Sequence, residues 1–175
     1  MKDFTILATD QSTTHVGWCI FDGKDPVSWG EFKPDPPHYD ALRRWIGDQI
    51  DELSKGDKVV YVAVEDVYLA SYPRKFTDQI KMVPQVEVYK KLLTVREHVH
   101  AATRDVGAEY LIVKPFDAMV ALTGVSDPKT KREERKKLMM KSAELLLGEK
   151  VSEHVSDSVG IGLGAYNQIF TELHR

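Results

Sequence analysis

Cysteine and long apolar runs are scarce in this sequence, and each scarcity excludes a class of protein. The only cysteine is Cys19, so an internal disulfide framework is excluded. Because Cys19 stands between Trp18 and Ile20, we expect it to be a small buried hydrophobic residue. No apolar run approaches the ~20 residues that a bilayer-spanning helix needs, and the N-terminal MKDFTILATD is too short and too acidic for a signal peptide. We therefore expect a cytosolic protein with no membrane contact.

The chain also has no excess of basic over acidic residues. The net charge is −3 and the pI is about 6.1, which argues against a generally basic coat for nucleic acid, so any nucleic-acid binding must come from a local patch. The chain has 175 residues, of which 42% are hydrophobic and 29% charged, as in ordinary soluble globular proteins. This length predicts a single domain, residues 1–175, with one sizeable core.

Hydrophobic periodicity predicts an α/β fold. The expected strands are 4–9, 16–21, 27–33, 59–64 and 109–113, and the expected helices are 39–54, 84–106, 115–123, 132–148 and 154–171. The first three strands form an antiparallel meander, which ends at a proline-rich stretch. The run VVYVAV at 59–64 is typical of a strand buried on both faces. We therefore predict a mixed five-stranded sheet flanked by helices, with the later strands parallel to the first.

Three stretches of the sequence carry carboxylates at the end of a predicted strand or near the start of a predicted helix. Asp10 ends the first predicted strand, and Glu65 ends the buried run. If these strands are parallel neighbours, both side chains emerge at the edge where α/β proteins place ligands; either could instead be an ordinary exposed strand-end carboxylate. His154 and Asp157 are three residues apart and share one face near a helix start, although His154 alone could be a surface or capping residue.

Together these four residues predict a metal site. An oxygen-rich set with one imidazole suits Mg²⁺ or Mn²⁺ better than Zn²⁺. Two such ions held ~4 Å apart stabilise the attacking and leaving oxygens of a phosphodiester, and their charge relieves the repulsion among the carboxylates. Such a site needs no serine or cysteine nucleophile.

At this point the chain resembles the RuvC-type Holliday junction resolvases of the ribonuclease H-like superfamily. The similar stretches are ILATDQSTTHVGW with Asp10 and Gly17, VAVEDVYLA with Glu65, KPFDAMVALTGVSDPKTKRE, and HVSDSVGIGLGAYN with His154 and Asp157. They cover almost the whole chain in the family's order. The resemblance implies a ribonuclease H-like fold and a homodimeric, Mg²⁺- or Mn²⁺-dependent endonuclease that cuts four-way DNA junctions. Asp10, Glu65 and Asp157 would bind the metal, and His154 would be a ligand or orient the attacking water.

Two departures from the family pattern stand out. The usual Pro-Gly after the first aspartate is Gln11-Ser12, and Gly160, Gly162 and Gly164 replace alanines of the last helix. Each interior glycine costs roughly 1 kcal/mol relative to alanine, so we expect very close packing of this helix on the sheet. A phosphate-cradling loop is the rival idea, but the spacing matches no such motif. The divergence is similar to that of virus-encoded members.

One basic segment is a candidate for binding DNA phosphates. Residues 129–137, KTKREERKK, carry a local net charge of +4. The resemblance implies that Lys129 and Lys131 approach the scissile phosphate, with Arg132 beside them. A solvated helix face with internal ion pairs is the alternative.

A second candidate DNA contact is YLASYPRKF at 68–76. Arg74 and Lys75 lie between Tyr72 and Phe76, and basic residues among aromatics suit unstacked bases and backbone phosphates. The resemblance implies an aromatic wedge at the junction centre, a part that Tyr72 or Phe76 could play. Both aromatics could instead pack under the loop.

The long helix at 84–106 has an apolar stripe, made of Val86, Tyr89, Leu92, Leu93 and Val99. The resemblance implies that this helix forms a two-fold dimer, which would place two active sites on symmetry-related strands of a junction. The same stripe could face the core of its own domain.

Other functions fit parts of the pattern. The opening TDQSTTHVGWCIFDG also resembles the phosphate-binding hairpin of sugar kinases and actin-like ATPases, which requires two such domains and a glycine where Ser12 stands. A nuclease acting on flaps, forks or RNA would keep the same metals, and a non-catalytic junction-binding protein would not need them. We expect Asp66, next to Glu65, to point to the other face of its strand and to be structural.

Overall fold

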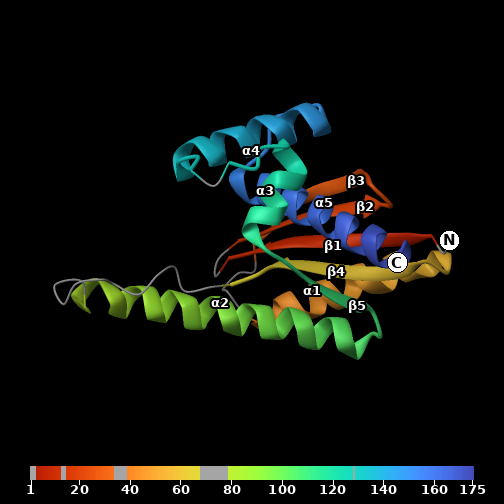
Figure 1. The fold of residues 1–175 in the computed structure, drawn as a ribbon. Helices are drawn as coiled ribbons and strands as arrows, with labels where there is room; N and C mark the ends of the chain where they lie inside the picture. The colour runs from red at the N-terminus through yellow and green to blue at the C-terminus, as the bar shows by residue number, and fades with distance from the viewer. Residues whose placement is uncertain (1–2, 13–14, 34–38, 68–78, 128) are drawn as a thin grey trace.

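The computed structural model describes residues 3–12, 15–33, 39–67, 79–127 and 129–175 (Figure 1). The strands are β1 (Phe4–Gln11), β2 (Val16–Asp22), β3 (Asp25–Phe32), β4 (Val59–Glu65) and β5 (Glu109–Val113). The helices are α1 (Tyr39–Leu53), α2 (Gln79–Asp105), α3 (Pro115–Thr123), α4 (Arg132–Leu147) and α5 (Glu153–Leu173), with a short 3₁₀ turn, Ser54–Gly56, after α1. The described part of the chain contains no helix long and apolar enough to cross a membrane.

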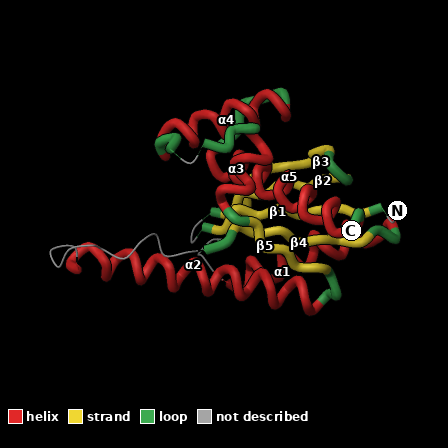
Figure 2. The backbone as a smooth tube through the Cα atoms, viewed as in Figure 1, coloured by secondary structure: helices red, strands yellow, loops and turns green. Residues whose placement is uncertain are grey.

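The strands form one mixed five-stranded sheet in the order β3-β2-β1-β4-β5. The β1–β2 and β2–β3 pairs are antiparallel, and the β1–β4 and β4–β5 pairs are parallel. The predicted meander and the predicted parallel strands are therefore confirmed. As Figure 2 shows, helices cover both faces of the sheet, and the two chain ends lie together at one end of it.

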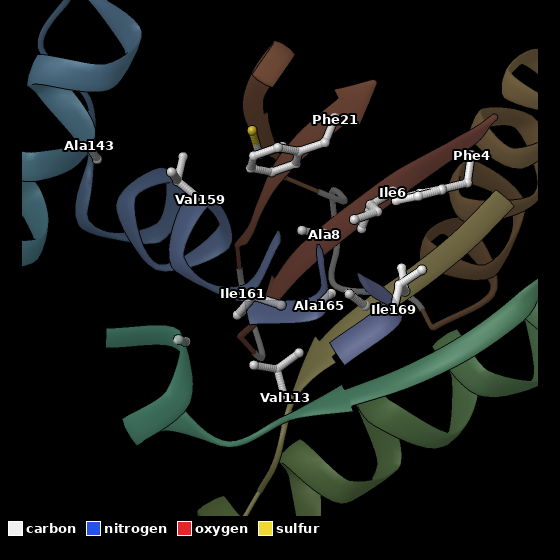
Figure 3. Close-up of a cluster of buried hydrophobic side chains, with 13 residues drawn as sticks. Phe4, Ile6, Ala8, Phe21, Val113, Ala143, Val159, Ile161, Ala165 and Ile169 are labelled. Atoms are coloured by element: carbon white, nitrogen blue, oxygen red, sulfur yellow. The ribbon is translucent and has the colours of Figure 1, made fainter. Parts of the chain in front are cut away.

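Each face of the sheet has its own core, because alternate residues of a strand point to opposite faces. On one face, α5 packs over β1 and β2, where Ile161 and Ala165 meet Ile6 and Ala8 (Figure 3), and α3 packs against α5. Helix α4 packs outside them, against α3 and α5. Cys19 is buried in this core as predicted, and burial raises the pKa of its thiol to about 12.

The other face is covered by α1 and α2. Their buried side chains, among them Ile46 of α1 and Val95 and Val99 of α2, pack on Leu7 and Val62 of the sheet. We call the two sides of the sheet the α5 face and the α2 face.

The glycines of α5 sit where the helix is closest to its neighbours. A Cβ at Gly162 would overlap with the ring of Phe21, and a Cβ at Gly164 would lie 2.6 Å from Cγ1 of Val113. A Cβ at Gly160 would lie 3.1 Å from the carbonyl oxygen of Ala118 on α3. The predicted close packing of this helix is confirmed, and it compensates for the low helix propensity of glycine.

Two predicted boundaries are wrong. β1 continues to Gln11, so Asp10 lies inside the strand rather than at its end, because its ladder with β2 extends to the pair Gln11–Val16. Helix α2 begins at Gln79 rather than at residue 84. Proline favours the first helical turn, so Pro84 misplaced the predicted start, although the helix continues through it.

The predicted apolar stripe of α2 divides between two environments. Val99 is fully buried in the core of the α2 face, as the alternative prediction had it. Val86, Tyr89, Leu92 and Leu93 are only partly buried. Figure 1 shows why: the N-terminal part of α2 extends past the end of the sheet.

Candidate active site

The candidate site begins with two carboxylates at one edge of the sheet. β1 and β4 are parallel and paired up to Thr9 and Val64, so Asp10 and Glu65 follow at the same edge. Asp10 is two residues after Ala8 in its strand, and Glu65 is two residues after Ala63, so each carboxylate points to the same face as its alanine. Both alanines belong to the core under α5. The two carboxylates therefore lie on the α5 face, and Asp10 is only 9% exposed.

The first turn of α5 delivers the other two residues to this edge. Ser152 caps the helix, and its hydroxyl oxygen accepts a hydrogen bond from the backbone N–H of Val155 at 3.3 Å. His154 and Asp157 follow on the same side of the helix, as predicted. Nδ1 of His154 lies 2.7 Å from Oδ2 of Asp10, so the helix start and the strand are in direct contact.

Gly17 is the reason that α5 can begin so close to the sheet. It is the cross-strand partner of Asp10 on β2, and a Cβ at Gly17 would overlap with the backbone carbonyl of His154. A side chain there would push the start of α5 away from Asp10. The glycine is thus required by a close backbone approach rather than by its backbone angles.

Two carboxylates of the site have strongly raised pKa values. Burial, reinforced by the charges of Asp10, Asp157 and Asp66, raises the pKa of Glu65 to about 8. Burial and the charges of Asp10 and Glu153 raise the pKa of Asp157 to about 7, against opposing effects of Lys136 and His154.

The same negative charge also raises the pKa of His154. The hydrogen bond with Asp10 raises the pKa of His154, which burial alone would lower. The site therefore holds more negative charge than its neighbours balance, and a cation is favoured there.

The donor set suits a hard divalent cation. Three carboxylates and one imidazole provide mainly oxygen ligands, the preference of Mg²⁺ and Mn²⁺. Within the described ranges, no three His, Cys, Asp or Glu side chains are already gathered closely enough to hold an ion. The raised pKa values of Glu65 and Asp157 are the observation that fits an ion, because a divalent charge would stabilise both ionised forms.

Two further residues, which the sequence analysis did not identify, border the site. The ring of His15 stacks on that of His154, with centroids 6.0 Å apart and planes 6° apart. Glu31 on β3 is the cross-strand partner of Gly17, and a hydrogen bond with the Ser152 side chain lowers its pKa. The strand register that places Asp10, Gly17 and Glu31 side by side cannot be predicted from the sequence. His15 could have been found, because it lies within the stretch ILATDQSTTHVGW.

Asp66 lies on the α2 face, as expected. Its backbone N–H donates to the carbonyl of Val113 at 2.8 Å, and its carboxylate pairs with Arg96 of α2 at 3.4 Å. This carboxylate is paired with an arginine, whereas the Asp10 carboxylate on the α5 face is paired with His154.

The predicted basic segment lies at the start of α4. Lys129, Lys131 and Arg132 are exposed. The backbone N–H of Lys129 donates to the Asp127 carboxylate at 2.9 Å. Further along, Lys136 pairs with Glu153 at the start of α5, which ties the basic helix to the candidate site. The other predicted DNA contacts, Tyr72, Arg74, Lys75 and Phe76, lie outside the described residues.

The chain matches no protein-family model and no curated protein sequence. Its structure is similar to that of RuvC from Thermus thermophilus, with a TM-score of 0.62 and 18% identity over 96% of this chain and 97% of that one. T. thermophilus RuvC in complex with a Holliday junction substrate matches at 0.60 and 17% identity, over 95% and 96% of the two chains. The yeast mitochondrial Holliday junction resolvase Ydc2 matches at 0.52 and 13%, over 97% of this chain and 80% of that one. The chain therefore has the RuvC-like, ribonuclease H-like fold.

Proposed function

We propose that this protein is a metal-dependent endonuclease that resolves four-way DNA junctions. One observation carries the proposal: Asp10, Glu65, His154 and Asp157, from three separate segments, converge at one edge of the sheet, and Asp10 contributes to the raised pKa of each of the other three. The likeness to two kinds of junction resolvase over nearly the full chain supports it.

Asp10, Glu65 and Asp157 would hold Mg²⁺ or Mn²⁺. Two bound divalent ions would stabilise the attacking and leaving oxygens of the phosphodiester. Asp10 is buried and Glu65 and Asp157 are partly buried, so these carboxylates would lose little further solvation when a cation binds. The acid set needs no side-chain nucleophile, which agrees with the burial of Cys19.

His154 would move or orient a proton at the site. Its Nδ1 is engaged by Asp10, which leaves Nε2 as the ring nitrogen available to the substrate, water or an ion. Asp10 fixes the ring orientation and favours the protonated imidazole. His15, stacked on the same ring, restricts its rotation.

The DNA would approach from the α5 side, where the exposed Lys129, Lys131 and Arg132 can neutralise backbone phosphates. A homodimer would form through the partly buried residues of the N-terminal half of α2 (Val86, Tyr89, Leu92 and Leu93). Its two-fold axis would place two active sites on opposite strands of one junction.

A cleavage assay across substrates tests this function. Purified protein is mixed with a synthetic four-way junction, a flap, a fork, a linear duplex and an RNA–DNA hybrid, each with Mg²⁺, Mn²⁺ or EDTA. The proposal predicts cutting of the junction with either metal and none with EDTA. Equal cutting of flap and fork would make the protein a general branched-DNA nuclease, and tight junction binding without any cutting would make it a non-catalytic junction binder.

A further inference from the structure

Three residues lie side by side across the first three strands at the edge of the candidate site. Asp10 of β1 pairs with Gly17 of β2, which pairs in turn with Glu31 of β3. Directly paired residues of antiparallel strands point to the same face of a sheet, so the Glu31 side chain lies on the α5 face, as Asp10 does. The start of α5 lies against Gly17, where a Cβ would overlap with the His154 carbonyl. One carboxylate therefore stands on each side of the helix start.

The two carboxylates hold different residues of the helix start. Oδ2 of Asp10 lies 2.7 Å from Nδ1 of His154, and the Glu31 carboxylate accepts a hydrogen bond from the Ser152 hydroxyl. The Ser152 oxygen in turn accepts from the backbone N–H of Val155 at 3.3 Å. A serine hydroxyl has a single proton to donate, so Glu31 fixes the direction of the group that caps α5.

Glu31 also forms an ion pair with Lys33 at the end of β3. Nζ of Lys33 lies 3.4 Å from Oε2 of Glu31, and the lysine side chain is 60% exposed. Exposed pairs of this kind have little effect on stability. The contact with α5 has the larger consequence, because a carboxylate next to a helix N-terminus also interacts favourably with the helix dipole.

His154 is the functional residue whose placement depends on this cap. It lies two residues after Ser152, in the first turn of α5, and its ring meets Asp10 there. A misplacement of about 1 Å at a reacting group can cost about 100-fold in rate. We propose that Glu31 is a positioning residue of the active site, which acts through Ser152 to hold the first turn of α5, and with it His154, against Asp10. The inference rests on the proposed function and adds a residue of β3 to the site.

A second contact between β3 and the segment before α5 provides a matched control. Trp29, two residues before Glu31 and on the same face, donates from Nε1 to the Glu149 carboxylate at 2.7 Å. Glu31→Ala and Glu149→Ala each remove one carboxylate contact between β3 and residues 149–152, so we expect similar losses of stability in urea unfolding. Only Glu31→Ala removes the contact with the cap.

Single-turnover cleavage of a four-way junction measures the proposed role. Glu31→Ala should lower the cleavage rate about 10- to 100-fold, with junction binding within about twofold of wild type, whereas Glu149→Ala should keep the wild-type rate. Glu31→Gln keeps an oxygen that accepts from the Ser152 hydroxyl, so its rate should return to within about threefold of wild type. Equal rates for Glu31→Ala and Glu149→Ala, or for Glu31→Gln and Glu31→Ala, would overturn the proposal.

A double-mutant cycle tests whether Glu31 acts through Ser152. Ser152→Ala removes the hydroxyl that connects Glu31 to α5, so adding Glu31→Ala to it should lower the cleavage rate no further. If the double variant instead loses the product of the two single effects, Glu31 acts independently of the cap and the proposal is wrong.

The ring of His154 provides a readout that needs no cleavage. In ¹⁵N-labelled protein without divalent ions, the ring-nitrogen signals of His154 are assigned by their loss in His154→Gln. These signals should shift in Glu31→Ala, and should stay near the wild-type position in Glu31→Gln and Glu149→Ala. Unchanged signals in Glu31→Ala would contradict the proposal. A wild-type protein that cuts no junction but shows these differences would contradict the proposed function and still support the role of Glu31 in placing His154.

Discussion

Two consecutive acidic residues have opposite electrostatic environments on the two faces of the sheet. Glu65 and Asp66 are consecutive, yet Glu65 lies on the α5 face among other carboxylates, and Asp66 lies on the α2 face beside Arg96. Burial and like charges raise the pKa of Glu65 to about 8. Asp66 instead has a cationic partner at 3.4 Å and a backbone hydrogen bond to β5.

We propose that this contrast separates a functional carboxylate from a structural one. A buried carboxylate surrounded by like charge is unfavourable for the fold alone, so its presence favours a role in binding a cation. A carboxylate paired with an arginine stabilises the fold without any ligand. Substitutions on the two faces should therefore have different consequences.

The largest difference is expected between Glu65→Gln and Asp66→Asn. Loss of one group that stabilises transition-state charge lowers the rate roughly 10²- to 10³-fold, so Glu65→Gln should lower junction cleavage by that factor while leaving junction binding intact. Asp66→Asn should stay within a few-fold of wild type, because a partly exposed ion pair contributes about 1 kcal/mol or less. Single-turnover cleavage and filter binding measure both, and equal losses from the two variants would remove the distinction between the faces.

Gly17→Ala should disrupt the packing of the start of α5 on the sheet by steric overlap. The new methyl group would meet the backbone of His154, and such overpacking costs about 1–3 kcal/mol or more. The start of α5 should move away from Asp10, so the free energy of unfolding and the cleavage rate should both fall. Gly47→Ala on α1, where a Cβ meets nothing within 4 Å, should gain up to about 1 kcal/mol. Urea unfolding curves of the two variants provide the comparison.

The raised carboxylate pKa values predict a specific pH dependence. Between about pH 4.5 and about pH 8 the folded protein binds more protons at Glu65 and Asp157 than the unfolded chain does. Without divalent cations, these two groups should therefore make the protein less stable as the pH rises through this window.

Magnesium should reverse this trend, because it binds the ionised carboxylates. The stabilisation on adding Mg²⁺, observed as an increase in melting temperature, should be small near about pH 5.5 and grow toward about pH 8. At a Mg²⁺ concentration one hundred times the dissociation constant, the free energy of unfolding should increase by about 2.7 kcal/mol. Thermal unfolding with Mg²⁺ or EDTA across this pH range measures it. Glu65→Gln should show a smaller shift, and a wild-type shift independent of pH would contradict this account of the site.

The smallest expected effect concerns the proposed DNA-binding surface at the start of α4. Lys131→Ala at the start of α4 should weaken junction binding modestly and reduce the slope of log K against log salt by about 1. Lys58→Ala is the control, because Lys58 precedes β4 at the opposite edge of the sheet and pairs with Asp22 at 2.7 Å. Equal salt slopes for both variants would argue against contact between the α4 start and DNA phosphates.

Much of the fold was predictable because its signals are local. The buried run of β4, the apolar periodicity of α1 and the order of elements together predict the mixed sheet, which the structure confirms. The start of α2 was not predictable, since Pro84 is a local signal for a helix start, although the helix begins at Gln79.

The candidate site was predictable only in part. Asp10, Glu65, His154 and Asp157 carry chemistry that can be recognised in the sequence, and the glycines of α5 indicated close packing. The place of Glu31 beside the start of α5 depends on strand register and on which face a side chain takes. Those properties follow from tertiary pairing, for which neighbouring residues in the sequence give no signal.

The most direct test of the central claim is strand-resolved cleavage of a four-way junction by the wild-type protein beside Asp157→Asn, with Mg²⁺ or EDTA. The account predicts paired nicks at symmetric positions for the wild-type protein with Mg²⁺. It predicts none with EDTA, and it predicts unchanged junction binding without nicks for Asp157→Asn. Cleavage by Asp157→Asn at the wild-type rate would contradict the assignment of the α5-face carboxylates as the catalytic site.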